Sequence, residues 1–326
     1  MNPAPFIRGC AFAAVPDVPY PRADPADAAR LPGDTWATAR LPVGVRLEFV
    51  GDGPEVTLRY RTATAELGYR GAGAGTTFAL WRGGTQVAEA AAVLGEGEVR
   101  LPTGDVAGGR AIVYLPEGMR PEVLAITAAG GSIEPAPPQP RWLAYGDSVA
   151  EGWSARAPAG AWPAVCGRQL GLDVVNLGYA GSARGEIASA EQIAGVPADV
   201  LTVSHGTNCW TRTPHSVGMM REGMLAFLEI LRQGHPSAPI IVISPVVRPD
   251  AETTPNRLGA TLGDLRAAIE EAAARTDVIV VPGADLLDPS LLADDGVHPS
   301  DEGHQVLAGA VGRALSAALG NEGGSR

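Results

Sequence analysis

The sequence predicts an α/β fold: a flavodoxin-like, doubly wound, five-stranded parallel sheet preceded by an all-β sandwich domain. Three observations lead to this prediction. Short runs of alternating polarity fill the first 135 residues, near-continuous apolar runs alternate with helical patterns after residue 140, and a proline-rich segment separates the two textures. The 326 residues suit two domains, and an apolar content of 45% is enough for sizeable cores.

Residues 1–135 are expected to form a jelly-roll-like β-sandwich. In residues 55–60, the side chains of Val56, Leu58 and Tyr60 point to one side and the polar side chains to the other, which is typical of a half-buried strand. Similar runs recur between Gly and Pro residues at 45–50, 76–81, 111–115 and 123–127. Many short strands at regular spacing favour an antiparallel sandwich.

Two further segments of this part are predicted to be irregular. The glycine-rich run 71–75 lacks the spacing and the following helix of a dinucleotide-binding loop, so we interpret it as a flexible loop. Residues 135–140 contain four prolines, which neither a helix nor a sheet can absorb. We therefore expect a linker at 136–140 between two domains.

Residues 141–326 are predicted to form the α/β domain. Strand-length apolar runs occur at 142–145, 174–177, 200–203, 240–243 and 278–281. Helical patterns are clearest at 216–232, 256–275 and 300–319. Near-continuous apolar strands that alternate with helices indicate a parallel sheet covered on both faces. The ligand site of such a sheet lies at the carboxyl ends of its strands.

Charge and hydropathy limit the partners. The net charge of −11 repels polyphosphates and anionic membrane surfaces, so neither nucleic acid nor a membrane is an expected partner. The first residues are interrupted by prolines and include no long apolar region, and no apolar run is long enough to span a bilayer. We therefore expect a cytoplasmic protein. Its oligomeric state is not predictable from the sequence.

Metals and disulfides are not expected. The three cysteines, Cys10, Cys166 and Cys209, form no C-x-x-C pair and are expected to be free thiols. No two of the five histidines have metal-ligand spacing with a cysteine or a carboxylate. His215 and His235 are interpreted as surface loop residues.

Residues that can carry out chemistry follow three of the predicted parallel strands. Gly146–Val149 ends the first strand, His205–Asn208 ends the third, and Asp295–Pro299 follows the fifth. Because the carboxyl ends of parallel strands lie at one edge of the sheet, these segments are expected to converge.

Ser148 and His298 are predicted to act as nucleophile and base. A serine needs a base to attack at neutral pH, and the base needs a carboxylate that fixes its tautomer and stabilises the imidazolium. Asp295, three residues before His298, can reach the imidazole in a tight turn. The Ser148 N–H, a glycine N–H and the Asn208 amide could stabilise the oxyanion of a tetrahedral intermediate.

These segments resemble the GDSL, or SGNH, hydrolases, and the resemblance runs in block order through residues 141–320. The first, second, third and fifth blocks of that family resemble, in order, Gly146–Ser148, Asn176–Gly181, Gly206–Asn208 and Asp295–Pro299. The resemblance implies a Ser-His-Asp triad that acts on an ester without a cofactor. A small acyl group is expected because the sequence has no long apolar lid segment. Many members have Asp where this chain has Cys209, a difference that removes no catalytic group.

The resemblance also assigns the oxyanion donors. Ser148, Gly181 and Asn208 would form the oxyanion hole, although Gly178 could supply the glycine N–H instead. Ser148 has an alternative interpretation as only a helix N-cap, and His304, in a second D-x-x-H pattern, is expected to lie on a helix away from the site.

Several residues near the blocks have less specific patterns. Trp210, Trp153 and Tyr179 could line a substrate pocket, although ordinary loop packing would explain them as well. Arg184 could face a substrate carboxylate, although a solvated helix start is the simpler explanation. Asp147 is interpreted as structural, and His205 as a packed neighbour of the third block.

The sequence therefore predicts a serine esterase that removes a small acyl group, such as acetyl, from a carbohydrate or another small molecule through an acyl-enzyme. Two alternatives stay open. Family members with an added sandwich also include acyltransferases on natural-product scaffolds, so the acceptor could be an alcohol rather than water. The sandwich could instead make the chain a carbohydrate-binding protein.

Overall fold

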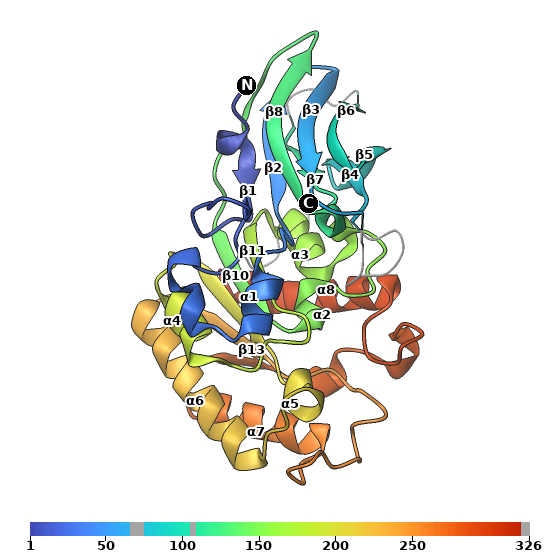
Figure 1. The fold of residues 1–326 in the computed structure, drawn as a ribbon. Coiled ribbons are helices and arrows are strands. Elements are labelled where there is room, and N and C mark those ends of the chain that lie inside the picture. Colours follow the sequence, from blue (N-terminus) through green and yellow to red (C-terminus); the bar gives the residue numbers. More distant parts are fainter. Residues whose placement is uncertain (66–74, 105–108, 321–326) are drawn as a thin grey trace.

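The computed structural model describes residues 1–65, 75–104 and 109–320 (Figure 1). The predicted flexible loop at 71–75 lies, except for Gly75, outside the described residues. Within the described ranges, no helix combines the length and the apolar character needed to cross a bilayer.

Two antiparallel sheets form the N-terminal part of the structure. The larger sheet has the strand order β1 (Ile7–Arg8), β2 (Arg46–Gly51), β7 (Ala111–Tyr114), β4 (Thr77–Arg82) and β5 (Thr85–Ala91), with β9 (Ile133–Pro135) also paired to β2. The smaller sheet has the order β6 (Gly95–Pro102), β3 (Glu55–Thr62) and β8 (Pro121–Ala129). Leu47, Phe49, Leu58 and Phe78 are fully buried in the core that these sheets share. The predicted all-β sandwich is confirmed.

The second part is built on a five-stranded parallel sheet. Its order is β11 (Asp173–Gly178), β10 (Arg141–Gly146), β12 (Val200–Ser204), β13 (Ile240–Ile243) and β14 (Ile279–Val281). Every neighbouring pair of these strands is parallel, and β11 is an edge strand. This is the doubly wound sheet that the sequence predicts.

Helices cover both faces of this sheet, as Figure 1 shows. One core contains residues of α4 (Ile187–Ala194), α6 (Val217–Gly234) and α7 (Leu262–Ala274), and the other contains residues of α3 (Trp162–Leu170) and α8 (Asp301–Ala318). On α8, Leu307, Val311 and Leu315 are buried and lie on one stripe of the helix.

Two sequence predictions need correction here. Helix α7 begins at Leu262 rather than at residue 256, because Thr261 and Asp264 form a capping box and Asn256 accepts hydrogen bonds from the Leu258 and Ala260 N–H groups in a turn. His235 is buried rather than on the surface, and its Nε2 lies 3.1 Å from the Ile193 carbonyl oxygen.

The segment between β1 and β2 packs on the parallel sheet. Helix α1 (Gly33–Ala39), blue in Figure 1, lies beside the sheet, and Ala23, Leu31 and Ala39 belong to the same apolar core as α4 and α6. Contacts between the first 41 residues and the α/β part are therefore extensive, and the division at 136–140 stays a prediction.

Candidate active site

The segment after β10 holds Ser148 at the start of a short helix, α2 (Ser148–Glu151). A Cβ on Gly146 would lie 2.3 Å from the Ser204 carbonyl oxygen, so only glycine lets the chain turn this close to β12. Asp147, not Ser148, caps α2, because its carboxylate accepts from the Val149 N–H. The Ser148 hydroxyl is therefore not occupied in capping.

Ser148, His298 and Asp295 form a hydrogen-bonded row. His298 Nε2 lies 2.8 Å from Ser148 Oγ, and His298 Nδ1 lies 2.6 Å from Asp295 Oδ2. Both distances are within hydrogen-bond reach for a nucleophile, a base and a carboxylate that orients the base. The structure thus brings together three residues that the sequence separates by up to 150 positions.

Asp295 is held in its turn by three donors. Its Oδ1 accepts from the Val297 and His298 N–H groups, and its Oδ2 faces His298 Nδ1. Partial burial alone would raise the pKa of Asp295, but these hydrogen bonds outweigh it and keep the pKa below its ordinary value. The side chain of Asp295 is 44% exposed and that of His298 only 14%, so the row runs from the solvent inward.

The ring of Trp153 packs against the imidazole of His298. Its ring centroid lies 5.1 Å from that of His298, with 32° between the rings. The Trp153 carbonyl oxygen lies 2.8 Å from Nε2 of His304, which is fully buried on α8. His304 is on the predicted helix, and its ring contacts the backbone of Trp153, the residue that packs on His298.

In the part of the chain that the structure describes, the loop that follows β11 leaves the Gly181 N–H unused, whereas the three N–H groups before it have acceptors. The Gly178 N–H donates to Asn176 Oδ1, the Tyr179 N–H to the Gly146 carbonyl and the Ala180 N–H to Glu151 Oε2. Within the described residues the Gly181 N–H donates to no protein acceptor. Gly178 has another reason to be glycine, because a Cβ there would lie 2.3 Å from the Glu151 nitrogen.

Asn208 lies on α5 (Thr207–Thr211), directly after β12. It is buried, and its Nδ2 donates to the Ala183 carbonyl at 3.1 Å, within the loop that contains Gly181. This hydrogen bond uses one of the two amide hydrogens and leaves the other for a substrate.

Tyr179 does not line a pocket, and that prediction is wrong. The side chain is buried, its hydroxyl donates to the Arg22 carbonyl at 2.7 Å, and its ring contacts Tyr145 edge to face. A tyrosine enclosed by the core cannot contact a substrate without unfolding the loop.

Arg184 and Trp210 also have protein partners. The Arg184 guanidinium contacts both Asp34 carboxylate oxygens, at 3.0 and 2.8 Å, and is mostly buried rather than solvated. Trp210 is half-buried, donates to the Thr254 carbonyl at 2.8 Å and carries Arg248 over its ring. Their contact with a substrate stays a prediction.

Burial shifts the pKa values of three ionisable groups that lie beside or within the first and third blocks. Burial lowers the pKa of His205 to about 3, so its ring is neutral and packs against Tyr145 and Phe227. Burial raises the pKa of Asp147 even though Val149 and Thr207 donate to its carboxylate. Burial also raises the pKa of the Cys209 thiol, which therefore stays protonated and is no nucleophile.

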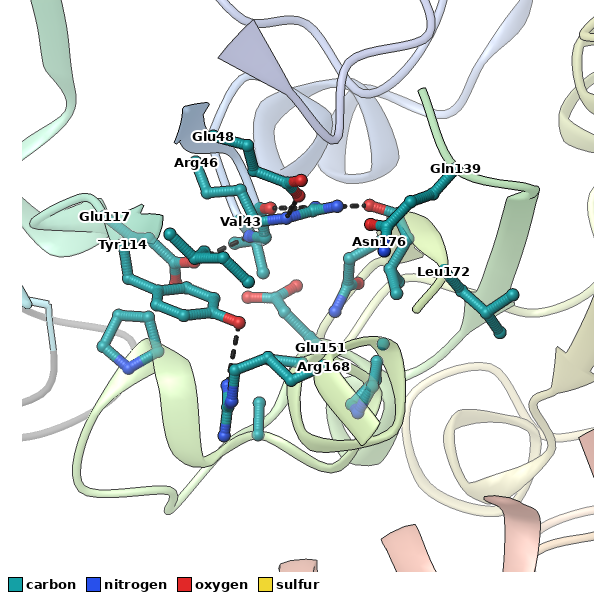
Figure 2. Close-up of a pocket in the computed structure, with 18 of the residues that line it drawn as sticks. Val43, Arg46, Glu48, Tyr114, Glu117, Gln139, Glu151, Arg168, Leu172 and Asn176 are labelled. Carbon is teal, nitrogen blue, oxygen red and sulfur yellow. Dashed lines mark hydrogen bonds and ion pairs between the residues drawn. The ribbon is translucent and has the colours of Figure 1, made fainter. Parts of the chain in front are cut away.

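A cavity of about 40 Å³ lies between the sandwich and α2 (Figure 2). Charged and polar side chains line it, among them Arg46, Glu117, Glu151 and Arg168. Figure 2 shows Glu151 pointing into this cavity from α2. The volume suits a few water molecules and no ester, so the cavity is not the substrate site. No sequence pattern singles out Glu151, because its contacts are with segments that are distant in the chain.

No cluster of three His, Cys, Asp or Glu side chains that could hold a metal ion occurs in the described part of the chain. The row places a hydroxyl, an imidazole and a carboxylate within hydrogen-bond reach of one another. Groups in this order are the ones that acyl transfer on a serine requires.

The comparisons with known proteins agree with this arrangement. The model of the GDSL-like Lipase/Acylhydrolase family matches residues 144–306. No curated protein matches the sequence.

Solved structures match over nearly the whole chain. A salicylyl-acyltransferase from a tetracycline biosynthetic pathway has a TM-score of 0.80 at 24% identity and covers 96% of this chain and 94% of its own. A GDSL-like lipase from Bacteroides ovatus has a TM-score of 0.75 at 20% identity and covers 96% and 95%. A family two carbohydrate esterase from Clostridium thermocellum has a TM-score of 0.62 at 16% identity and covers 85% and 92%.

Proposed function

Because the chain belongs to the GDSL-like lipase/acylhydrolase family, we propose that it is a serine esterase that cleaves a small acyl ester through an acyl-enzyme on Ser148. The observation that carries this proposal is the hydrogen-bonded row of Ser148, His298 and Asp295. The family supplies the reaction class, and the row supplies the residues.

In the first half-reaction, His298 Nε2 takes the Ser148 hydroxyl proton while Ser148 Oγ bonds to the ester carbonyl carbon. Asp295 stabilises the imidazolium that forms. The carbonyl oxygen becomes an oxyanion, for which the Ser148 N–H, the Gly181 N–H and the Asn208 amide are the proposed donors. When the tetrahedral intermediate collapses, the C–O bond to the alcohol breaks and the alcohol leaves with the proton from His298.

In the second half-reaction, a water molecule attacks the acyl carbon and gives a proton to His298. The bond to Ser148 Oγ then breaks, Ser148 recovers its proton from His298, and the acid leaves. The atoms balance without a metal or a redox cofactor, because the same base takes and returns one proton in each half-reaction.

The first experiment measures hydrolysis of p-nitrophenyl acetate and butyrate by wild type and by Ser148→Ala. We expect the variant to lose at least about 10³-fold in kcat, because the row lacks its nucleophile. Ser189→Ala is the matched control, since Ser189 is a buried serine on α4 outside the site. Equal rates in wild type and Ser148→Ala would contradict the proposal.

Transfer to an alcohol is the second candidate function. It is supported by the fold likeness to a salicylyl-acyltransferase, whose TM-score of 0.80 exceeds the 0.62 of the carbohydrate esterase. Both reactions use the same acyl-enzyme and differ in how far the site excludes water. Adding glycerol or a sugar alcohol and measuring acylated product against free acid separates them: the esterase yields mainly the acid, whereas the transferase yields mainly the new ester.

A further inference from the structure

Arg22, far from the family blocks in the sequence, is buried against the loop that carries Gly181. Its side chain is 0% exposed, and its Nη1 donates to the Gly178 carbonyl and, at 3.4 Å, to the Asn176 carbonyl. These two carbonyls lie at the end of β11, immediately before the loop. The contact joins the N-terminal segment to the part of the α/β domain that is nearest to the reaction.

The other donors of Arg22 anchor it in its own segment. Nε donates to the Leu41 carbonyl at 2.7 Å, and Nη2 donates to the Thr38 carbonyl at 2.7 Å, at the end of α1. The backbone of Arg22 also contributes, because its carbonyl accepts from the Tyr179 hydroxyl and its N–H donates to Ala39. The guanidinium is therefore fixed in one orientation by contacts on both sides.

Glu151 connects this arginine to the proposed oxyanion donor. Its Oε2 lies 3.5 Å from Arg22 Nη2 and accepts from the Ala180 N–H at 2.8 Å. Ala180 directly precedes Gly181. Glu151 is also the last residue of α2, the helix that begins with Ser148, so it ties the loop to the nucleophile's own helix.

Helix α1 holds the far end of the same loop. Asp34 pairs with Arg184, and Thr35 Oγ1 donates to Glu186 Oε1 at 3.0 Å. The N-terminal segment thus contacts the loop before and after Gly181, while Gly181 itself contacts no protein acceptor among the described residues. Because the loop is held at both ends, the Gly181 N–H keeps a fixed direction.

Given the acyl-transfer function proposed above, we infer that Arg22 is a positioning residue that acts through Glu151 and Ala180 to aim the Gly181 N–H at the oxyanion. Arg22 touches neither substrate nor nucleophile. Its effect is on the transition state, because a preorganised donor lowers the barrier only where negative charge develops.

The test compares Arg22→Lys with Arg46→Lys. Both arginines are buried, come from the N-terminal half and donate to β11 carbonyls, but Arg46 reaches Val174 at the beginning of the strand. A lysine ammonium cannot reproduce the several directed hydrogen bonds of a guanidinium. We expect kcat on p-nitrophenyl acetate to fall about 10- to 100-fold in Arg22→Lys with KM within threefold, and kcat to stay within twofold in Arg46→Lys.

Hydrogen–deuterium exchange of residues 178–186 provides a readout that does not need activity. Exchange should be faster than wild type in Arg22→Lys and unchanged in Arg46→Lys. If Arg22→Lys does not fold, Glu151→Gln replaces it, since it keeps the shape but weakens both contacts, and we expect about a tenfold lower kcat and faster exchange in the same loop.

Equal loss of kcat in the two lysine variants, or unchanged exchange and kcat in Arg22→Lys, would overturn the inference while Ser148→Ala still decides the proposed function. If wild type does not hydrolyse the ester at all, the proposed function fails. Hydrogen–deuterium exchange alone then decides whether Arg22 positions the loop. Faster exchange of residues 178–186 in Arg22→Lys but not in Arg46→Lys supports this role, and unchanged exchange in Arg22→Lys refutes it.

Discussion

The two ends of β11 each receive a buried arginine from the N-terminal half, yet they differ in what lies next to them. At the amino end, Arg46 donates to the Val174 carbonyl and pairs with Glu48 and Asp173. At the carboxyl end, Arg22 borders the loop with Gly181. Both arginines are buried, but Arg46 pairs with two carboxylates, at 2.7 and 3.0 Å, whereas Arg22 pairs with Glu151 at 3.5 Å. We expect the arginine at the carboxyl end, beside the loop with Gly181, to affect the reaction, and the arginine at the amino end to affect the stability of the fold.

The largest expected effect on stability is at the amino end. Arg46→Met leaves the carboxylates of Glu48 and Asp173 buried without this partner, and we expect a loss of about 3–5 kcal/mol in the free energy of unfolding. Urea denaturation at pH 7 measures it. Arg61→Met is the control, because Arg61 is exposed beside Glu96, solvent screens this ion pair, and its removal should change the free energy of unfolding far less. A kcat for Arg46→Met that falls as far as that of Arg22→Lys would remove the distinction between the two ends.

Substitutions near the carboxyl ends of the strands are expected to lower kcat. Asn208→Ala removes an amide proposed to contact the oxyanion, so kcat should fall by about 10²–10³ with little change in KM. Steady-state kinetics on p-nitrophenyl acetate measures both. Asn256→Ala removes another amide, which donates to the His215 carbonyl at 2.9 Å and to the Cys209 carbonyl at 3.5 Å but not to the loop with Gly181, and its kcat should stay within threefold of wild type. Similar losses in the two variants would mean that Asn208 acts through folding only.

The smallest expected effect is on the pH dependence of stability, and it comes from His205. The pKa of His205 is about 3 in the folded protein and 6.5 for an unperturbed imidazole. Between these values only the unfolded chain binds the proton, so the stability from neutral His205 is complete above about pH 6.5 and is lost as the pH falls toward 3. Relative to His205→Leu, wild type should lose about 2 kcal/mol between pH 7 and pH 5.

Denaturant unfolding of both proteins at the two pH values measures this difference. Leucine also changes the packing, but that contribution to the free energy of unfolding is the same at both pH values. It therefore cancels when only the change between pH 7 and pH 5 is compared. Parallel stability curves for wild type and variant would show that His205 is protonated in the folded protein, contrary to its burial against Tyr145 and Phe227.

The sequence was informative where local pattern decides the structure. Apolar runs predicted all five parallel strands, and three strand ends predicted the segments that carry Ser148, Asn208 and His298, which the structure places at one edge of the sheet. Their catalytic roles stay a prediction. The beginning of α7 was wrong by six residues, because a capping box at Thr261 outweighs the apolar pattern before it.

Long-range contacts could not be predicted in the same way. Arg22 and Glu151 are 129 positions apart in sequence, and neither has a motif. Tyr179 was mispredicted for the same reason, since its partner is the backbone of Arg22 rather than a neighbour in the chain. Such residues are defined by the docking of one half on the other, which no single-segment pattern encodes.

The arginines also have a consequence for association between chains. An edge strand such as β11 offers unpaired carbonyls to any other extended chain, and proteins block such edges to prevent aggregation. Here the carbonyls of Val174, Asn176 and Gly178, at every second residue, accept from Arg46 and Arg22. Side chains thus occupy the positions that a sixth strand would take. A chain that starts at residue 141 would lack both arginines and expose this edge, so we expect it to pair with its own copies more readily than the full chain does.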